Sequence, residues 1–148
     1  MHHMELDEII YNALTAEPQL SAATDGRIYS TCIEVPPTDD DNTPLPYIVI
    51  NEEQSHNDQA TKDSVWESIM DVVNVGVIIN AESPKAVKRL RRLARTAVGA
   101  YVATMQRNAP YLLSLSYDGI TWDWTKPCYY DTLHYSCSMN ISTDHEQE

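Results

Sequence analysis

The most regular segment of the sequence runs from Ser83 to Met105 and reads SPKAVKRLRRLARTAVGAYVATM. Its apolar side chains recur every three or four residues, which is the period of an α-helix that covers a core with one face. Ser83 is a favoured N-cap and Pro84 a favoured first helical residue, so the start of the helix is also indicated. We predict a long helix with an apolar face made of Val87, Leu90, Ala94, Ala97, Val98, Tyr101 and Met105.

The same segment concentrates the positive charge of the chain. Six of the ten lysines and arginines lie in residues 84–95, which contain no acidic residue. The net charge of −12 therefore divides into +6 in this segment and −18 elsewhere. Five of these cations fall nearly opposite the apolar face of the helix: Lys85, Lys88, Arg89, Arg92 and Arg95.

Strong acidity outside the helix bears on the class of partner. The chain has 22 acidic residues and a pI near 4.6, and a phosphate backbone would be repelled by most of its surface. The charge therefore argues against a general nucleic-acid binder. The cationic face has three interpretations: a solvated helix face, a nucleic-acid contact that the other charges disfavour, and a contact between subunits that they favour.

Towards the N-terminus the pattern predicts one short helix and three strands. The helix covers residues 5–14, and Pro18 ends it. The strands are expected at 27–33, 47–50 and 73–79, with the third extending back through Trp66 and a polar hairpin tip at 53–63. Residues 36–44 form an acidic loop bounded by prolines, and its centre is Asp39, Asp40 and Asp41.

Towards the C-terminus three further strands are predicted. Residues 111–117 lead into Asp118-Gly119, a two-residue hairpin signal, after which 120–124 continue as the next strand and 133–141 as the last. The polar tail 143–148 is expected to be disordered. The order α-β-β-β-α-β-β-β predicts one α+β domain over residues 1–148, a mostly antiparallel sheet with both helices on one face.

Composition supports a folded domain made and used in the cytoplasm. The chain has 148 residues, of which 43% are hydrophobic and 22% charged, close to ordinary globular usage. No run of 18 apolar residues and no signal-peptide pattern occurs, so we expect no membrane partner. The three cysteines, Cys32, Cys128 and Cys137, form no paired motif and are interpreted as reduced strand residues.

The search for catalytic motifs finds none. Only four glycines are present, and neither phosphate-binding glycine motif occurs, nor do the common zinc and nucleophile-elbow motifs. His56 with Asp58 lacks a second ligand cluster, and the aspartates of the 36–44 loop lack the spacing of a calcium loop. The residue types of a thiol site occur in Cys128, Asp131 and His134, but His134 alternates with apolar residues and is expected on the opposite face. We therefore predict no catalytic residue, cofactor or metal.

Two tryptophans stand apart from this negative result. Trp122 and Trp124 alternate along one predicted strand, so both rings share a face of the sheet. They are interpreted either as packing under the long helix or as a contact surface, since tryptophan is enriched at the centre of interfaces.

The layout resembles the tail completion, or tail terminator, proteins of long-tailed bacteriophages and prophages. The residues that carry the resemblance are the turn into Gly26-Arg27-Ile28-Tyr29, the proline-introduced strand at 45–50 and the helix led by Ser83-Pro84, within residues 5–142. The acidic loop at 36–44 and the paired tryptophans depart from the family pattern.

The resemblance implies a structural, non-enzymatic role in the virion. Such proteins assemble as rings, typically hexamers, that cap the tail tube and dock to the head–tail connector protein. On this basis the partners are further copies of the chain, the tail tube protein and the connector, and the location is the head–tail junction, after assembly in the bacterial cytoplasm. A ring needs two different patches that meet. The cationic helix face is one candidate patch, and an acidic loop or edge is the other.

The resemblance also implies that the viral genome passes through the ring. Asp39, Asp40 and Asp41 are then candidates for an acidic lumen that repels DNA and does not bind it. Two other functions remain open: a neck or adaptor protein of the same virion, and a small cytosolic ligand-binding or enzymatic domain. In the second case the pocket is expected between helix 84–105 and the sheet, near Trp122 and Trp124.

Overall fold

The chain folds into one sheet with helices on a single face, as described by a computed structural model. It describes residues 5–30, 36–53, 56–59 and 69–140. The elements are α1 (Leu6–Ala16), α2 (Pro18–Thr24), β1 (Ile28–Tyr29), β2 (Tyr47–Glu52), β3 (His56–Gln59), β4 (Ile69–Ala81), α3 (Pro84–Met105), β5 (Tyr111–Tyr117), β6 (Thr121–Asp123) and β7 (Cys128–Asn140).

Two long antiparallel strands, β4 and β7, form the centre of the sheet. Each has 13 residues, and they pair along nearly their whole length, from Met70 with Asn140 to Ala81 with Tyr129. The main strand order is β1-β2-β4-β7-β5. β2 and β3 both lie along the outer side of β4, and β5 and β6 both lie along the outer side of β7. The pairing of β1 with β2 is parallel, and the other pairings are antiparallel.

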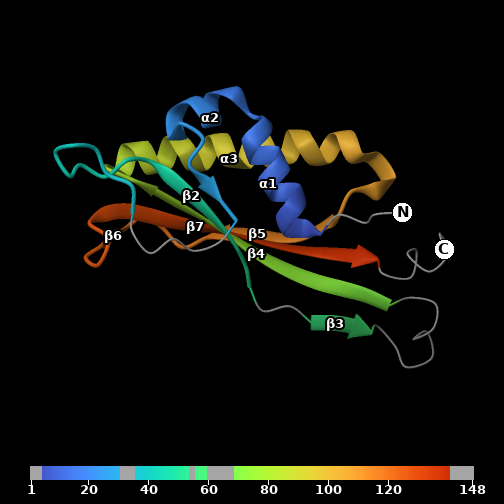
Figure 1. Cartoon of the computed structure of the whole chain (residues 1–148). Coiled ribbons are helices and arrows are strands. Elements are labelled where there is room, and N and C mark those ends of the chain that lie inside the picture. Colours follow the sequence, from blue (N-terminus) through green and yellow to red (C-terminus); the bar gives the residue numbers. More distant parts are fainter. Residues whose placement is uncertain (1–4, 31–35, 54–55, 60–68, 141–148) are drawn as a thin grey trace.

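The helices pack together over one face of the sheet, as Figure 1 shows. The buried side chains of α3 are Val87, Leu90, Ala94, Ala97 and Val98, five of the seven residues expected on its apolar face. They meet alternate residues of the central strands, such as Val75 and Leu133, because successive strand residues point to opposite faces. The predicted α+β class, with a mostly antiparallel sheet and helices on one face, is confirmed.

The predicted start of the long helix is also confirmed. The Ser83 hydroxyl accepts a hydrogen bond from the backbone N–H of Ala86 at 3.1 Å, and Pro84 is the first helical residue. The helix ends at Met105, where Gln106 adopts a positive φ of 55° and begins a 3₁₀ turn.

Three sequence-based expectations near the N-terminus are corrected. Pro18 ends α1 but also begins a second helix, α2, because proline suits a first helical position and Glu17 caps the next turn. The segment expected as a polar hairpin tip contains β3. The strand expected at 73–79 is described from Ile69, within its expected backward extension, but it ends later than expected, at Ala81, because β7 pairs with it up to that residue.

The hairpin expected at Asp118-Gly119 is wrong. β5 and β6 run in the same direction along one edge of β7, so residues 118–120 are a bulge in an interrupted strand and not a turn. Gly119 has a φ of +109°, and its N–H donates to Asp131 Oδ1 at 2.9 Å. A buried carboxylate of the partner strand therefore fixes the bulge, a long-range contact that the local sequence does not reveal.

Several predictions fall outside the described residues. These are the end of the first predicted strand with Cys32, the extension of β4 through Trp66, and the tail 143–148.

Candidate assembly surface

The five predicted cations of α3 are exposed. Lys85, Lys88, Arg89, Arg92 and Arg95 all face solvent, and no ion pair is recorded for them among the described residues. Their Cβ atoms lie away from the buried stripe of the helix, as the 3.6-residue period requires. The cationic face is therefore available for a partner.

Arg91, the sixth cation of the segment, has a different role. Its Nη1 lies 2.7 Å from Oδ2 of Asp131, whose side chain is fully buried. The guanidinium also lies 4.2 Å from the ring centre of Tyr117 on β5, within the range of a cation–π contact. Arg91 thus ties α3 to β7 and β5 from within the fold.

An apolar strip lies along β5, at one edge of the sheet. Tyr111, Leu112, Leu113 and Tyr117 are each about half exposed or more. An edge strand also presents backbone groups that can pair with another chain. Large apolar side chains on such an edge are typical of a protein–protein contact, and this strip was not expected from the sequence.

A cavity of about 450 Å³ lies next to the apolar strip, under the second half of α3. Its apolar lining comes from α1, α3, β5 and β7, and Arg92, Arg95 and Thr96 supply polar groups. The lining residues are Leu6, Ile10, Arg92, Arg95, Thr96, Val98, Gly99, Val102, Pro110, Leu112, Leu115, Tyr135 and Cys137. The expectation of a pocket between helix and sheet is met, but neither tryptophan lines it.

Tyr135 contributes a buried polar group to this cavity. The residue is 4% exposed, and its hydroxyl has no hydrogen-bond partner among the described residues. Burial raises its pKa to about 12, although nearby Arg95 acts in the opposite direction. Burial likewise raises the pKa of the Cys137 thiol to about 11. Both groups are therefore neutral at physiological pH.

Trp122 and Trp124 lie at the other end of the β7 edge. Their ring centres are 5.8 Å apart in an edge-to-face arrangement, and Trp122 also packs on Tyr129 at 4.9 Å. Trp124 follows β6 in a turn and is 85% exposed, so it does not pack under α3. Trp122 is half-buried, so only Trp124 extends the exposed aromatic surface beyond the bulge.

The acidic loop at 36–44 is closed by its own hydrogen bonds. Asp39 Oδ1 accepts from the N–H groups of Asp41 and Thr43, both at 2.9 Å, and Thr38 pairs with Pro44. The three carboxylates from Asp39 to Asp41 remain exposed, as expected of a solvated turn.

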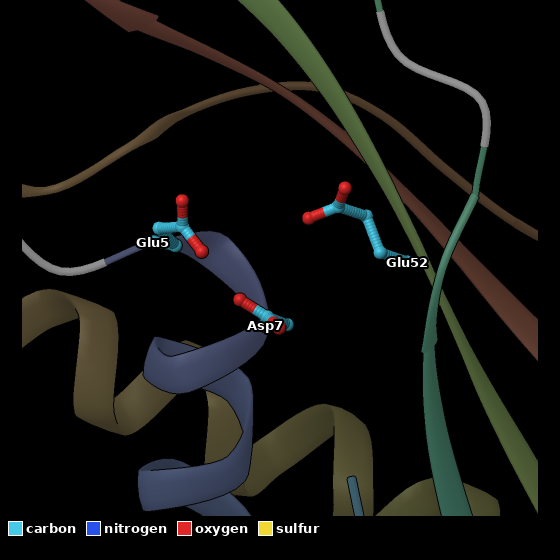
Figure 2. A group of neighbouring side chains, drawn as sticks. All are labelled: Glu5, Asp7 and Glu52. Carbon is cyan, nitrogen blue, oxygen red and sulfur yellow. The ribbon is translucent and has the colours of Figure 1, made fainter. Parts of the chain in front are cut away.

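A second acidic group is formed by residues far apart in sequence. Glu5 and Asp7 from the start of α1 face Glu52 at the end of β2, as Figure 2 shows, and one oxygen of each lies within 4.8 Å of the others. We call these three residues the acidic patch. The helix N-terminus favours Glu5 and Asp7 electrostatically, and the packing of α1 against β2 brings Glu52 beside them.

The residue types of a thiol site are not brought together. Cys128 is buried and its thiol lies 3.8 Å from Asn80 Oδ1, while Asp131 is held by Arg91. His134 lies on the opposite face of β7, as expected, between Glu53 and Asp118 at 3.0 Å each. The side chain of His56 lies outside the described residues.

Comparisons with known proteins show a likeness of fold to solved structures. No protein-family model and no curated protein matches the chain. A solved structure described as the virion of a native gene transfer agent particle contains a chain of similar fold, with a TM-score of 0.52 and 16% identity. The match covers 91% of this chain and 94% of that chain, so the whole domain shares its fold.

The described helices contain no segment long and apolar enough to cross a membrane.

Proposed function

We propose that the chain is a structural protein of a phage-like virion, which assembles as a ring at the head–tail junction and caps the tail tube. The observation that carries this proposal is the likeness to a gene transfer agent virion chain across nearly the full length of both. An assembly role also explains why an acidic protein exposes both a cationic helix face and an apolar sheet edge.

A ring requires one patch to meet a different patch on the next copy. The uneven charge of the chain suits such a contact, because opposite charges steer and orient association. The carboxylates of Asp39 to Asp41 repel the phosphates of DNA. The acidic loop therefore suits a lumen through which DNA passes without binding. On this account the partners are other copies, the tail tube protein and the head–tail connector protein.

Negative-stain electron microscopy with the cognate tail tube protein tests this function. The chain is added to preformed tubes, and tube ends are compared with and without it. We expect a ring-shaped density at one end and a halt of further tube growth. Bare ends with unchanged growth contradict capping, and binding to the connector alone favours a different neck or adaptor protein of the same virion.

The cavity under α3 supports one other function, a ligand-binding domain. A volume of about 450 Å³ is within the range of small-molecule sites. A thermal-shift screen against a metabolite library separates the two functions. A ligand-dependent rise in Tm for a monomeric chain favours this alternative, whereas no shift for an oligomeric chain favours the virion role.

A further inference from the structure

The cavity under α3 opens at the edge of the sheet that β5 forms. Leu112, which is 51% exposed, lines both the cavity and the edge. Arg92 and Arg95 bring two unpaired guanidinium groups to the same place, since no ion pair is recorded for them in the described part of the chain. The site therefore combines an apolar recess, two cations and a Tyr135 hydroxyl that has no hydrogen-bond partner among the described residues. Such a site fits an occupant that is apolar and acidic.

The acidic patch has the complementary character. Glu5, Asp7 and Glu52 gather three carboxylates, and within the described residues no cation is recorded as their partner. Tyr11 follows Asp7 by one helical turn, so the two side chains are neighbours on α1. Tyr11 is also 37% exposed. Apart from the side chains of β5 and Trp124, it is the one large apolar side chain exposed among the described residues.

Among the described residues, the two surfaces lie at opposite ends of a single row across the sheet, because β1 pairs with β2 only at Ile48 and Val49. Glu52 pairs with Val75 of β4, Val75 with Tyr135 of β7, and Tyr135 with Leu115 of β5. Directly opposed residues in antiparallel strands point to the same face, so all these side chains lie on the helix-covered face. A second copy placed beside the first, with the two sheets in line, brings one copy's patch to the other's cavity.

We propose that the acidic patch and Tyr11 of one copy dock on the cavity mouth, Arg92 and Arg95 of the next copy. The contact is head-to-tail, because the acidic patch of each copy binds the cavity of one neighbour while its own cavity binds the acidic patch of the other neighbour. The inference rests on the proposed ring and names its subunit interface. It assigns the charge pairing to the C-terminal half of the cationic face, and not to Lys85 and Lys88.

Reciprocal charge reversal tests this contact. One variant carries Arg92→Glu with Arg95→Glu, and the other carries Asp7→Lys with Glu52→Lys. Each alone is expected to lose the oligomer, with at least a tenfold weaker self-association by light scattering. An equimolar mixture is expected to recover it, because each interface in the mixed ring then joins opposite charges. Lysine in the first turn of α1 opposes the helix dipole, so Glu52→Lys alone is measured as a milder second variant.

The control is Lys85→Glu with Lys88→Glu, which makes the same change of charge on the same helix outside the cavity. The control is expected to keep the oligomer. An oligomer that survives Arg92→Glu with Arg95→Glu overturns the contact, and so does equal loss in the control. A fatty acid or similar amphiphile retained in the purified protein, detected by native mass spectrometry, also contradicts it.

Tube capping separates failure of this contact from failure of the proposed function. If the wild-type protein and the Arg92→Glu with Arg95→Glu variant cap tubes equally well, the proposed contact is overturned but the proposed function is supported. Wild-type protein that does not cap tubes overturns the function whatever the oligomer masses show. If wild-type protein is a monomer in solution, the same variants are scored by capping, and the same pattern of loss and recovery is expected.

Discussion

At the residue scale, an ion pair joins Arg91 to the fully buried side chain of Asp131. Asp131 also accepts hydrogen bonds from the N–H groups of Gly119 and Thr132, so one carboxylate joins α3, the bulge and β7. Removing one partner of a buried pair leaves an uncompensated charge and costs about 3–5 kcal/mol. We expect Asp131→Ala to lower the free energy of unfolding by this amount in urea titrations.

Asp40→Ala is the matched control for that prediction. Asp40 lies exposed in the acidic loop, and surface substitutions away from special features usually change stability by less than about 0.5 kcal/mol. Equal stabilities of the two variants would show that the Arg91 contact does not support the fold.

His134 gives the fold a pH dependence. The hydrogen bond to Asp118 raises its pKa above the usual 6.5, burial opposes this, and Glu53 adds to the rise. Protonated His134 stabilises the fold because its pKa is higher in the folded chain than in the unfolded chain. This stabilisation is complete at a pH below the pKa of the unfolded chain, and it is lost as pH rises through the pKa of the folded chain. We therefore expect His134 to contribute less to the free energy of unfolding at about pH 8.5 than at about pH 5.5.

His134→Gln is expected to flatten this part of the pH profile. The measurement is chemical unfolding of both proteins across the pH range, and the difference between the two profiles isolates the histidine. About a third of the side chain is exposed, so the effect is reduced by solvent screening. Parallel profiles would contradict the role assigned to the two carboxylates.

The face of β7 on which His134 lies was predictable from the alternation of apolar and polar residues. The partners of His134 were not, because they lie 16 and 81 positions away in the sequence.

At the scale of elements, the bulge between β5 and β6 depends on a glycine. Gly119 has a φ of +109°, a conformation that side chains with a Cβ rarely adopt. We expect Gly119→Ala to reduce stability by about 1–3 kcal/mol, the usual cost of a strained backbone residue, in denaturant unfolding. No atom lies within 4 Å of the added Cβ, so strain is the sole cause.

Gly99→Ala is the contrasting substitution. Gly99 lies inside α3, and an added Cβ meets nothing within 4 Å. Alanine is favoured over glycine in a helix interior by about 0.8–1 kcal/mol, so this variant is expected to be more stable than wild type. Destabilisation of both variants to the same degree would contradict the distinction between bulge and helix.

Elements with a local signal were predictable, and those fixed by distant contacts were not. Ser83, Pro84 and the apolar period determine α3 within 23 residues, so its bounds follow from sequence. Asp118-Gly119 has the local signature of a hairpin, but Asp131 holds it as a bulge from the adjacent strand. β3 has little apolar character, and its position comes from pairing with β4.

At the scale of the whole molecule, the charge division was predictable and the shape of the interface was not. The five cations are exposed as their helical positions predict. The cavity joins residues of α1, α3, β5 and β7, and the acidic patch joins the start of α1 to the end of β2. The apolar strip lies within β5, but its position at an edge depends on the pairing of β5 with β7. Sequence therefore indicated that the surface is two-sided in charge, and the sheet order indicates how two such surfaces can meet.

Ionic strength separates the charged part of the proposed interface from the apolar part. Exposed charges are screened over about 3 Å at 1 M salt and about 10 Å at 0.1 M. We expect the oligomer to weaken, but not vanish, when salt is raised, because Tyr11 and the β5 strip are not screened. Sedimentation velocity at both salt concentrations measures this. An oligomer that strengthens with salt would contradict charge pairing.

The virion role itself is tested most directly on purified particles. Particles are isolated from a strain that produces them, and this chain is counted by quantitative mass spectrometry and located by immunogold labelling. The account predicts a small fixed number of copies, all at the head–tail junction, and particles with tails of uncontrolled length when the chain is deleted. Absence of the chain from the particles, or labelling spread over the head, would contradict it.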